Sequence, residues 1–270
     1  MKVTIFTSNS LRHLSLINKI SSISKECNAI VEVKTLFPGF NKDFFKKSKK
    51  MRKYFIKVDK AEKKYFRENN YVKNHINLKM IKHGDLNSLN KDDLKFALNS
   101  DVYIIFGASY IKNKWLINFL IKKKAINIHM GLSPFYRGSS CNFWALYDKN
   151  PEYVGATIHY LSKGLDSGNI ISHCLPNHKE KNFFEYTMSA VLSSQNCLKH
   201  LIKSKKLFKI KPKKQDKGLQ MSYTRNKEFN DKSINKFWKI KKIDIQNSFK
   251  KNDHLKKLLF NPYYFNKKGD

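Results

Sequence analysis

The chain has 270 residues, of which 41% are hydrophobic and 13% aromatic, enough for one large domain or for a domain with a small appendage. A mean hydropathy of −0.58 and the lack of any apolar run of about twenty residues exclude a membrane span. The net charge of +33, from 54 Lys and Arg against 21 Asp and Glu, leaves two explanations open. It could attract nucleic acid, anionic lipid or a phosphorylated substrate, or it could reflect an A·T-rich coding sequence.

The chain begins with a predicted β-α-β unit. Lys2–Ser8 predicts a strand, Leu11–Lys25 has apolar residues at helical spacing, and Asn28–Leu36 returns to strand character before Pro38-Gly39. A helical crossover of this kind places the two strands parallel in one sheet. The turn after the first strand reads Ser8-Asn9-Ser10 and lacks the glycines of a dinucleotide-binding fingerprint, which argues against a nicotinamide dehydrogenase.

The next segment is strongly basic. Between Asn41 and Asn70 aromatic residues are interleaved with lysines, which predicts a solvated pair of amphipathic helices or, alternatively, an anion-binding flap over a site. Leu78–Ile81 then predicts a short strand and Leu86–Leu98 a helix.

The middle of the chain repeats the alternation. Val102–Phe106 is an apolar run typical of a strand buried on both faces. A helix over Asn113–Lys124 and a strand over Ala125–Ile128 follow. Strands that alternate with helices predict a doubly wound α/β sheet, in which ligands bind beyond the carboxyl ends of the strands.

The pattern changes in the last third. Ala156–Leu161 and Ile170–Cys174 predict two more strands, joined by the turn Lys163–Asn169, and Phe183–Lys203 predicts a helix. A basic linker over Lys209–Lys217 leads into an aromatic tail. We expect a domain over residues 1–180 and a C-terminal extension of helix, linker and tail over 181–270.

Three polar residues form the candidate site. Asn127 and His129 are two positions apart at a strand end, so their side chains leave the same face of the sheet. Asp166 lies in a turn flanked by Gly164 and Gly168 between two strands, within reach of the same crevice.

The surrounding pattern resembles the folate-dependent formyltransferases that use 10-formyltetrahydrofolate. Their hallmark is Asn-x-His, a Leu-x-Pro and Arg-Gly loop, and an Asp in an Asp-x-Gly turn after a Thr-containing strand. The matching positions are Asn127, His129, Leu132, Pro134, Arg137, Gly138, Thr157, His159, Asp166 and Gly168. The resemblance implies a Rossmann-like, mostly parallel sheet over roughly residues 1 to 180.

The chemistry of formyl transfer suits these side chains. Transfer to an amine passes through a tetrahedral species that carries an oxyanion and an ammonium. Asn127 can donate to the oxyanion, and His129 can stabilise it or carry a proton near neutral pH. Asp166 would favour the imidazolium and could relay a proton through water. This chemistry requires no metal and no covalent nucleophile.

The resemblance also implies contacts with the two substrates. The co-substrate 10-formyltetrahydrofolate would contact Phe106, Gly107, Ala108, Ser109, Tyr110, Ile111 and Lys163. The acceptor would contact Met130, Gly131, Arg137, Gly138 and His159, although His159 could instead fill the core.

The expected acceptor depends on the composition of the last third of the chain, which is poor in glycine. Residues 186–270 contain only Gly218 and Gly269, too few for the barrel-like C-terminal domain of methionyl-tRNA formyltransferases. We therefore expect an amino-sugar acceptor, nucleotide-linked and used for surface polysaccharide, with methionyl-tRNA as the alternative. A basic nucleic-acid-binding protein is the alternative of another class, but no binding motif supports it. The tail aromatics Tyr223, Trp238 and Tyr263 could stack on a base or sugar, or serve a core or a homodimer.

Cysteine usage and the N-terminus indicate the compartment. Four scattered cysteines form no Cys-x-x-Cys pair, which predicts free thiols rather than zinc ligands or disulfides. The first apolar stretch is too short for a signal peptide. We expect a cytoplasmic protein without membrane contact.

Overall fold

The computed structural model describes residues 1–35, 40, 43–240 and 244–266. Its strands and α-helices, in chain order, are β1 (Lys2–Ser8), α1 (Leu11–Ser21), β2 (Glu26–Val33), α2 (Lys49–Phe66), β3 (Asn77–Lys82), β4 (Val102–Phe106), α3 (Lys114–Lys122), β5 (Ile126–His129), β6 (Tyr136–Gly138), α4 (Cys141–Tyr147), β7 (Ala156–Tyr160), β8 (Ile170–Cys174), α5 (Phe183–Lys203), β9 (Ser222–Thr224), α6 (Asp231–Trp238), α7 (Ile245–Lys251) and α8 (Asp253–Leu258).

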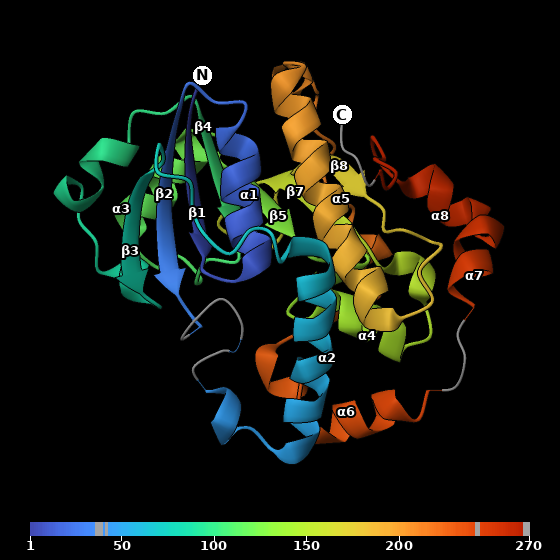
Figure 1. The fold of residues 1–270 in the computed structure, drawn as a ribbon. Coiled ribbons are helices and arrows are strands. Elements are labelled where there is room, and N and C mark those ends of the chain that lie inside the picture. Colours follow the sequence, from blue (N-terminus) through green and yellow to red (C-terminus); the bar gives the residue numbers. More distant parts are fainter. Residues whose placement is uncertain (36–39, 41–42, 241–243, 267–270) are drawn as a thin grey trace.

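A seven-stranded sheet in the order β3-β2-β1-β4-β5-β7-β8 forms the centre of the molecule (Figure 1). The strands from β3 to β5 run parallel, and β7 and β8 continue the sheet in antiparallel fashion. The predicted doubly wound, mostly parallel α/β fold is confirmed.

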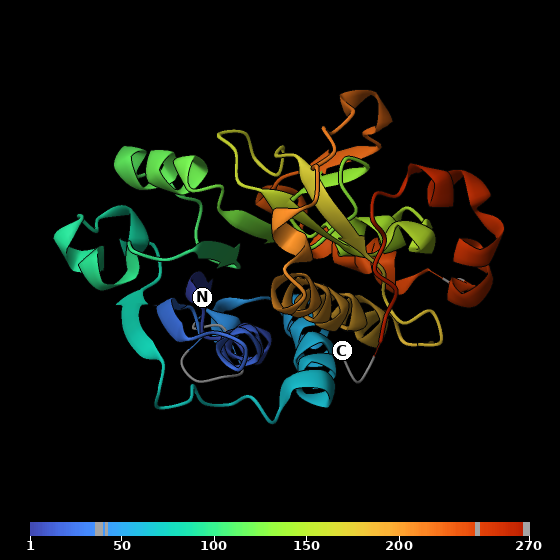
Figure 2. The same ribbon diagram turned by 90° about the horizontal axis from the view of Figure 1, so that it is seen from above.

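Both faces of the sheet are covered by helices. In β4, Ile104 and Phe106 face the core beneath α1, α2 and α5, whereas Tyr103 and Ile105 face the core beneath α3. This alternation follows from the two-residue period of a strand, and an apolar residue at every position is what a strand buried on both sides requires. Figure 2 shows α3 on the opposite side of the sheet from α1 and α5.

The strand order reverses between β1 and β4, and this reversal positions the site. After β1 the chain turns into α1 on one face, and after β4 it leads to α3 on the other. The two connections therefore diverge and leave a crevice at the carboxyl ends of the central strands, where doubly wound sheets bind their ligands.

Two expectations about helices were wrong. In place of a helix over Leu86–Leu98 the chain forms two 3₁₀ helices, Asp85–Asn87 and Asp92–Ala97. Between them Asn90 and Asp93 exchange hydrogen bonds from backbone N–H to side-chain oxygen at 2.9 Å each, a local alternative that competes with helical hydrogen bonding.

The basic segment forms one α-helix, α2, preceded by a 3₁₀ helix over Phe44–Lys46, rather than a pair of α-helices. Lys47 is extended, and the Ser48 hydroxyl accepts from the backbone N–H of Met51 at 3.1 Å, so α2 begins afresh at Lys49. The predicted turn at Pro38-Gly39, the end of the second strand at Leu36 and the start of the basic segment at Asn41 lie outside the described residues.

The last third packs against the rest of the chain. Helix α5 has the predicted bounds and contacts α1, α2 and the strands β7 and β8. Beyond it, β9 pairs in parallel with β6, and Tyr263 forms a bridge with Cys174 of β8. Helices α6, α7 and α8 occupy the region expected to be an aromatic tail (Figure 1). None of the helices in the described ranges is long and apolar enough to cross a bilayer.

Candidate active site

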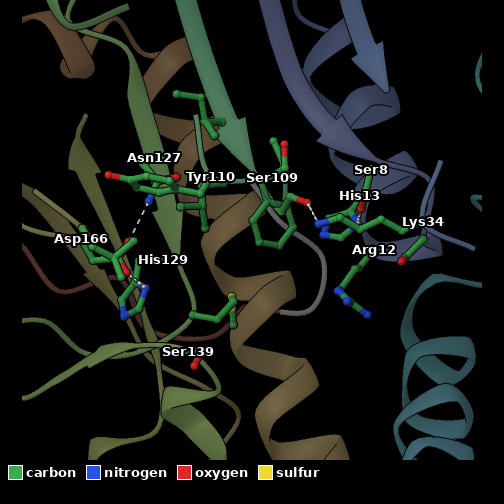
Figure 3. A pocket seen from close by; sticks show the side chains of 18 of the residues that line it. Ser8, Arg12, His13, Lys34, Ser109, Tyr110, Asn127, His129, Ser139 and Asp166 are labelled. Carbon is green, nitrogen blue, oxygen red and sulfur yellow. Dashed lines mark hydrogen bonds and ion pairs between the residues drawn. The ribbon is translucent and has the colours of Figure 1, made fainter. Parts of the chain in front are cut away.

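The structure brings the three predicted catalytic residues together. Asn127 and His129 project from β5, and Asp166 reaches them from the turn after β7 (Figure 3). Nδ1 of His129 lies 3.3 Å from Oδ2 of Asp166, and Nδ2 of Asn127 donates to the other carboxylate oxygen at 3.3 Å. One carboxylate therefore contacts both partners.

The turn that carries Asp166 is held from two sides. Asp166 has a φ of 47°, in the left-handed region that few residues other than glycine adopt. Its carbonyl accepts from the amide of Gln215 at 2.9 Å, and the neighbouring Leu165 carbonyl accepts from Arg137 at 2.7 Å. Because such strain persists only where surrounding contacts enforce it, these braces fix the position of the carboxylate.

His129 is buried, with 6% of its side chain exposed. Burial lowers the pKa of His129 below its ordinary value, while the Asp166 carboxylate and the Tyr136 carbonyl oppose that shift. Nε2 lies 3.1 Å from the Tyr136 carbonyl oxygen, and Nδ1 faces Asp166. Both nitrogens thus face an oxygen acceptor, so a protonated ring would find a partner for each N–H.

Asp166 is ionised despite its burial. Burial alone would raise the pKa of Asp166, but the neighbouring His129, His159 and Arg137 outweigh it and hold that pKa below its ordinary value. The resting pair at neutral pH is therefore a carboxylate beside a neutral imidazole.

His159 supports Asn127. Nδ1 of His159 lies 2.8 Å from the Tyr160 carbonyl oxygen, which favours the tautomer with hydrogen on that nitrogen. Nε2 is then free to accept from the Asn127 amide at 3.0 Å. His159 is 1% exposed, and it both lines the site and fills the core.

A cavity of about 570 Å³ opens on this cluster. Figure 3 shows it extending from Asn127, His129 and Asp166 to Ser8, Arg12, His13 and Lys34. All seven residues predicted to contact the co-substrate line it: Phe106, Gly107, Ala108, Ser109, Tyr110, Ile111 and Lys163. Its size lies within the usual range for small-molecule sites, about 300–1,000 Å³.

The loop after β4, which forms one wall of this cavity, is fixed by side chains from other segments. The buried Glu32 carboxylate accepts from the N–H and the hydroxyl of Ser109 at 2.5 and 2.7 Å. Lys34 donates to the Gly107 carbonyl at 2.7 Å, and Asn87 donates to the Tyr110 carbonyl at 3.1 Å. The loop's backbone groups are thus held in place before any ligand binds.

Several lining residues were not predicted from the sequence. His13 accepts or donates a hydrogen bond with Ser8 at 2.6 Å, packs edge-on against Phe106, and has a pKa held well below its ordinary value by burial. Arg12 beside it binds Glu62. Their place directly after the first strand is the signal that could have identified them, because that is where a doubly wound sheet opens.

A second cavity, of about 640 Å³, adjoins the first, and both are lined by Arg12, Lys47, Phe55, Val58, His129, Met130 and Gly138. Helices α2, α4, α5 and α6 contribute to its walls, and most of its lining residues are apolar or aromatic in type. The residues that line the second cavity alone are Met51, Tyr54, Ser140, Asn142, Phe143, Leu146, Phe183, Phe184, Thr187, Met188, Val191, Asn226, Phe229 and Phe237.

The residues predicted to contact the acceptor separate into two groups. Met130 and Gly138 line both cavities, and His159 lines the first. Gly131 and Arg137 line neither. Arg137 binds the Leu165 carbonyl and Gln220, and Gly131 lies where a Cβ would come within 2.8 Å of the His129 ring. Within the described ranges no three His, Cys, Asp or Glu side chains gather as a metal site.

Comparisons with known proteins show the family to which the chain belongs. The family model described as formyl transferase matches residues 2–181 of the 270. A methionyl-tRNA formyltransferase of Staphylococcus epidermidis is 39% identical over 80 residues, which are 30% of this chain and 25% of that protein. The chain thus matches about a quarter of the length of that curated relative.

Solved structures are similar over more of the chain. A 4-N formyltransferase from Francisella tularensis aligns with 100% of this chain and 94% of its own, at 18% identity and a TM-score of 0.53. An N-formyltransferase from Helicobacter canadensis, solved with folinic acid and dTDP-3-aminofucose, aligns with 97% of this chain and 83% of its own, at 16% identity and a TM-score of 0.53. At these identities the likeness shows a shared fold.

Proposed function

Because the chain belongs to the formyl transferase family, we propose that it moves the formyl group of 10-formyltetrahydrofolate to the amine of a nucleotide-linked amino sugar. One observation carries the proposal: two cavities meet at His129, where Asn127 and Asp166 are in contact. A transferase must bring a donor and an acceptor together in a defined orientation, and much of its rate enhancement comes from that positioning.

The first cavity suits a folate. Ile105, Phe106 and Ile111 offer apolar surface for a flat heterocycle, and the fixed backbone of the loop after β4 offers hydrogen-bonding groups for its polar edge. Basic residues Lys34 and Lys163 also line this cavity and supply positive charge for the carboxylates of a folate. The bound co-substrate would supply the activated formyl group.

Asn127 stabilises the oxyanion that forms when an amine attacks the formyl carbon. Its amide donates to His159 at 3.0 Å and to Asp166 at 3.3 Å. The bond to Asp166 is the longer of the two, and an oxyanion that develops in the cavity would accept from the amide in its place. His159 holds the amide in the orientation that this requires.

His129 and Asp166 handle the proton that the attacking amine loses. The neutral ring can accept a proton on Nδ1, the nitrogen that faces the carboxylate. Once charged, the ring is stabilised by Asp166 on one side and by the Tyr136 carbonyl on the other. Asp166 can also bind the amine directly or through water.

Support for an amino-sugar acceptor comes from the extent of the similarity. The Helicobacter canadensis protein, whose structure holds dTDP-3-aminofucose, aligns with 97% of this chain. The match to a methionyl-tRNA formyltransferase covers 30% of it. The second cavity, at about 640 Å³, has room for a small-molecule acceptor beside His129.

The proposal is tested by supplying the purified protein with 10-formyltetrahydrofolate and separate acceptors. The panel comprises dTDP-linked and UDP-linked amino sugars and methionyl-tRNA, with products identified by mass spectrometry. We expect formylation of at least one amino-sugar nucleotide. Formylation of methionyl-tRNA alone would replace the acceptor, and no formylation of any amine would refute the activity.

A further inference from the structure

Tyr54 lies at the centre of the aromatic wall of the second cavity. Its ring centroid is 5.1 Å from that of Phe184, 5.3 Å from Phe229, 5.7 Å from Phe143 and 5.9 Å from Phe237. These rings come from α4, α5, α6 and the segment before α6, so four parts of the chain hold one side chain. Its orientation is therefore fixed before a ligand binds.

The phenol of Tyr54 has no hydrogen-bond partner in the part of the chain that the structure describes. Burial raises the pKa of this phenol, so it carries its hydrogen throughout the physiological range. The Tyr54 side chain is half-buried and lines the cavity, so its hydroxyl can bond to water there until a ligand group takes that place. A hydroxyl that is held in place, keeps its hydrogen and has no partner within the described protein is suited to donate a hydrogen bond to a ligand in the cavity.

Several other polar side chains of this cavity already have partners within the protein. The Asn142 side chain exchanges hydrogen bonds with the backbone of Gly155 at 2.9 and 3.0 Å. The Thr187 hydroxyl donates to the Phe184 carbonyl at 3.0 Å. Arg12 is paired with Glu62 at 2.7 Å. Ser140 and Asn226 are exposed, and Lys47 and His129 line both cavities, so Tyr54 is the polar group of the aromatic wall.

We propose that the Tyr54 hydroxyl donates a hydrogen bond to an oxygen of the acceptor, a sugar hydroxyl or an acyl carbonyl, and so selects acceptors that carry an oxygen beside their apolar surface. The inference rests on the proposed function, because it takes the second cavity as the acceptor's. Apolar pockets commonly obtain their specificity from a few placed polar groups of this kind.

Tyr54→Phe tests the proposal by removing one oxygen and keeping the ring cluster. Tyr147→Phe is the matched control, because that ring packs on Phe143 at 5.8 Å but does not line the cavity. Using the amino-sugar nucleotide that the wild type formylates, we expect Tyr54→Phe to raise the KM for the acceptor roughly five- to tenfold. The kcat and the KM for 10-formyltetrahydrofolate should stay within about twofold of the wild type, as should all three constants of Tyr147→Phe.

The outcomes distinguish the role of Tyr54 from the proposed formyl transfer. Equal acceptor KM values for the two variants would overturn the role of Tyr54 while leaving formyl transfer intact. A fall in kcat without a change in KM would also overturn it, since a binding group acts on affinity. Failure of the wild type to formylate any amino sugar refutes the proposed function itself. Thermal unfolding of both variants shows whether the ring cluster survives.

Discussion

Nδ1 of His129 lies 3.3 Å from Oδ2 of Asp166, and the two residues reach this contact from different elements, β5 and the turn after β7. The carboxylate has its own supports, because the Asp166 carbonyl is held by Gln215 and the preceding Leu165 carbonyl by Arg137. Residues far apart in sequence thus fix the contact between His129 and Asp166. The proposed chemistry depends on that pair and on Asn127 beside it.

Asn127→Ala should lower kcat about 10²- to 10³-fold with a smaller change in KM, because the lost donor acts on charge that develops in the transition state. Steady-state kinetics at saturating substrates measures this. Asn113→Ala is the control, since Asn113 caps α3, lines neither cavity and should leave kcat unchanged in the folded protein. A kcat for Asn127→Ala within a few fold of the wild type would contradict the assigned role.

The pH dependence of transfer should report His129. Its pKa is held below the ordinary value of 6.5, so the neutral, proton-accepting ring is present above pH 6.5 and is lost as the pH falls through that lowered pKa. The pKa of Asp166 is lower than 3.8, so the carboxylate stays charged over the same window. We expect kcat to fall on the acidic side of pH 6.5. A rate that rises with acidification would show that a protonated ring is required instead.

Gly107→Ala should weaken co-substrate binding. Gly107 has a φ of 71°, and an added Cβ would lie 2.3 Å from Nε2 of His13, so His13 and the loop would have to shift. Gly84→Ala is the matched control, because Gly84 has a φ of 98° but nothing within 4 Å of an added Cβ. Both variants should lose about 1–2 kcal/mol of stability from the left-handed backbone. The KM for 10-formyltetrahydrofolate should rise in Gly107→Ala, and a rise in both variants alike would argue against a local effect.

Glu62→Gln should destabilise the protein more than Asp59→Asn. Glu62, 7% exposed, accepts from the Arg12 guanidinium at 2.7 Å and from the Arg12 backbone N–H at 2.9 Å, and so ties α2 to α1. Asp59 pairs with Lys63 one turn along the same helix, and Lys63 is half exposed. We expect a loss of about 1–3 kcal/mol for Glu62→Gln and under about 1 kcal/mol for Asp59→Asn in urea unfolding. Equal losses would show that the pair does not hold α2 in place.

The sequence predicted the elements whose pattern is local. The alternation of Lys2–Ser8 and the helical spacing of Phe183–Lys203 produced the observed bounds of β1 and α5. The Asn-x-His spacing likewise predicted that Asn127 and His129 share a face. These features follow from the two- and 3.6-residue periods alone.

Other features depend on which segments meet in space. The role of Tyr54 arises because α6 and the segment before it pack on α2, and no local pattern shows that pairing. Arg12 acquires its partner from α2, fifty residues along the chain. The α-helix predicted over Leu86–Leu98 does not form for a local reason. The side chains of Asn90 and Asp93 accept hydrogen bonds from each other's backbone N–H groups, which competes with helical hydrogen bonding.

Comparison of the wild type with Asp166→Asn tests most directly whether the contact between Asp166 and His129 is required for formyl transfer. The substitution keeps the shape of the side chain but removes the charge that faces His129 at 3.3 Å. Both proteins are given saturating 10-formyltetrahydrofolate and a dTDP-linked amino sugar, and the initial rate of formylated product is followed by mass spectrometry. We expect rapid formylation by the wild type and a rate about 10²- to 10⁴-fold lower for a folded Asp166→Asn protein. Equal rates for the two proteins would contradict this expectation.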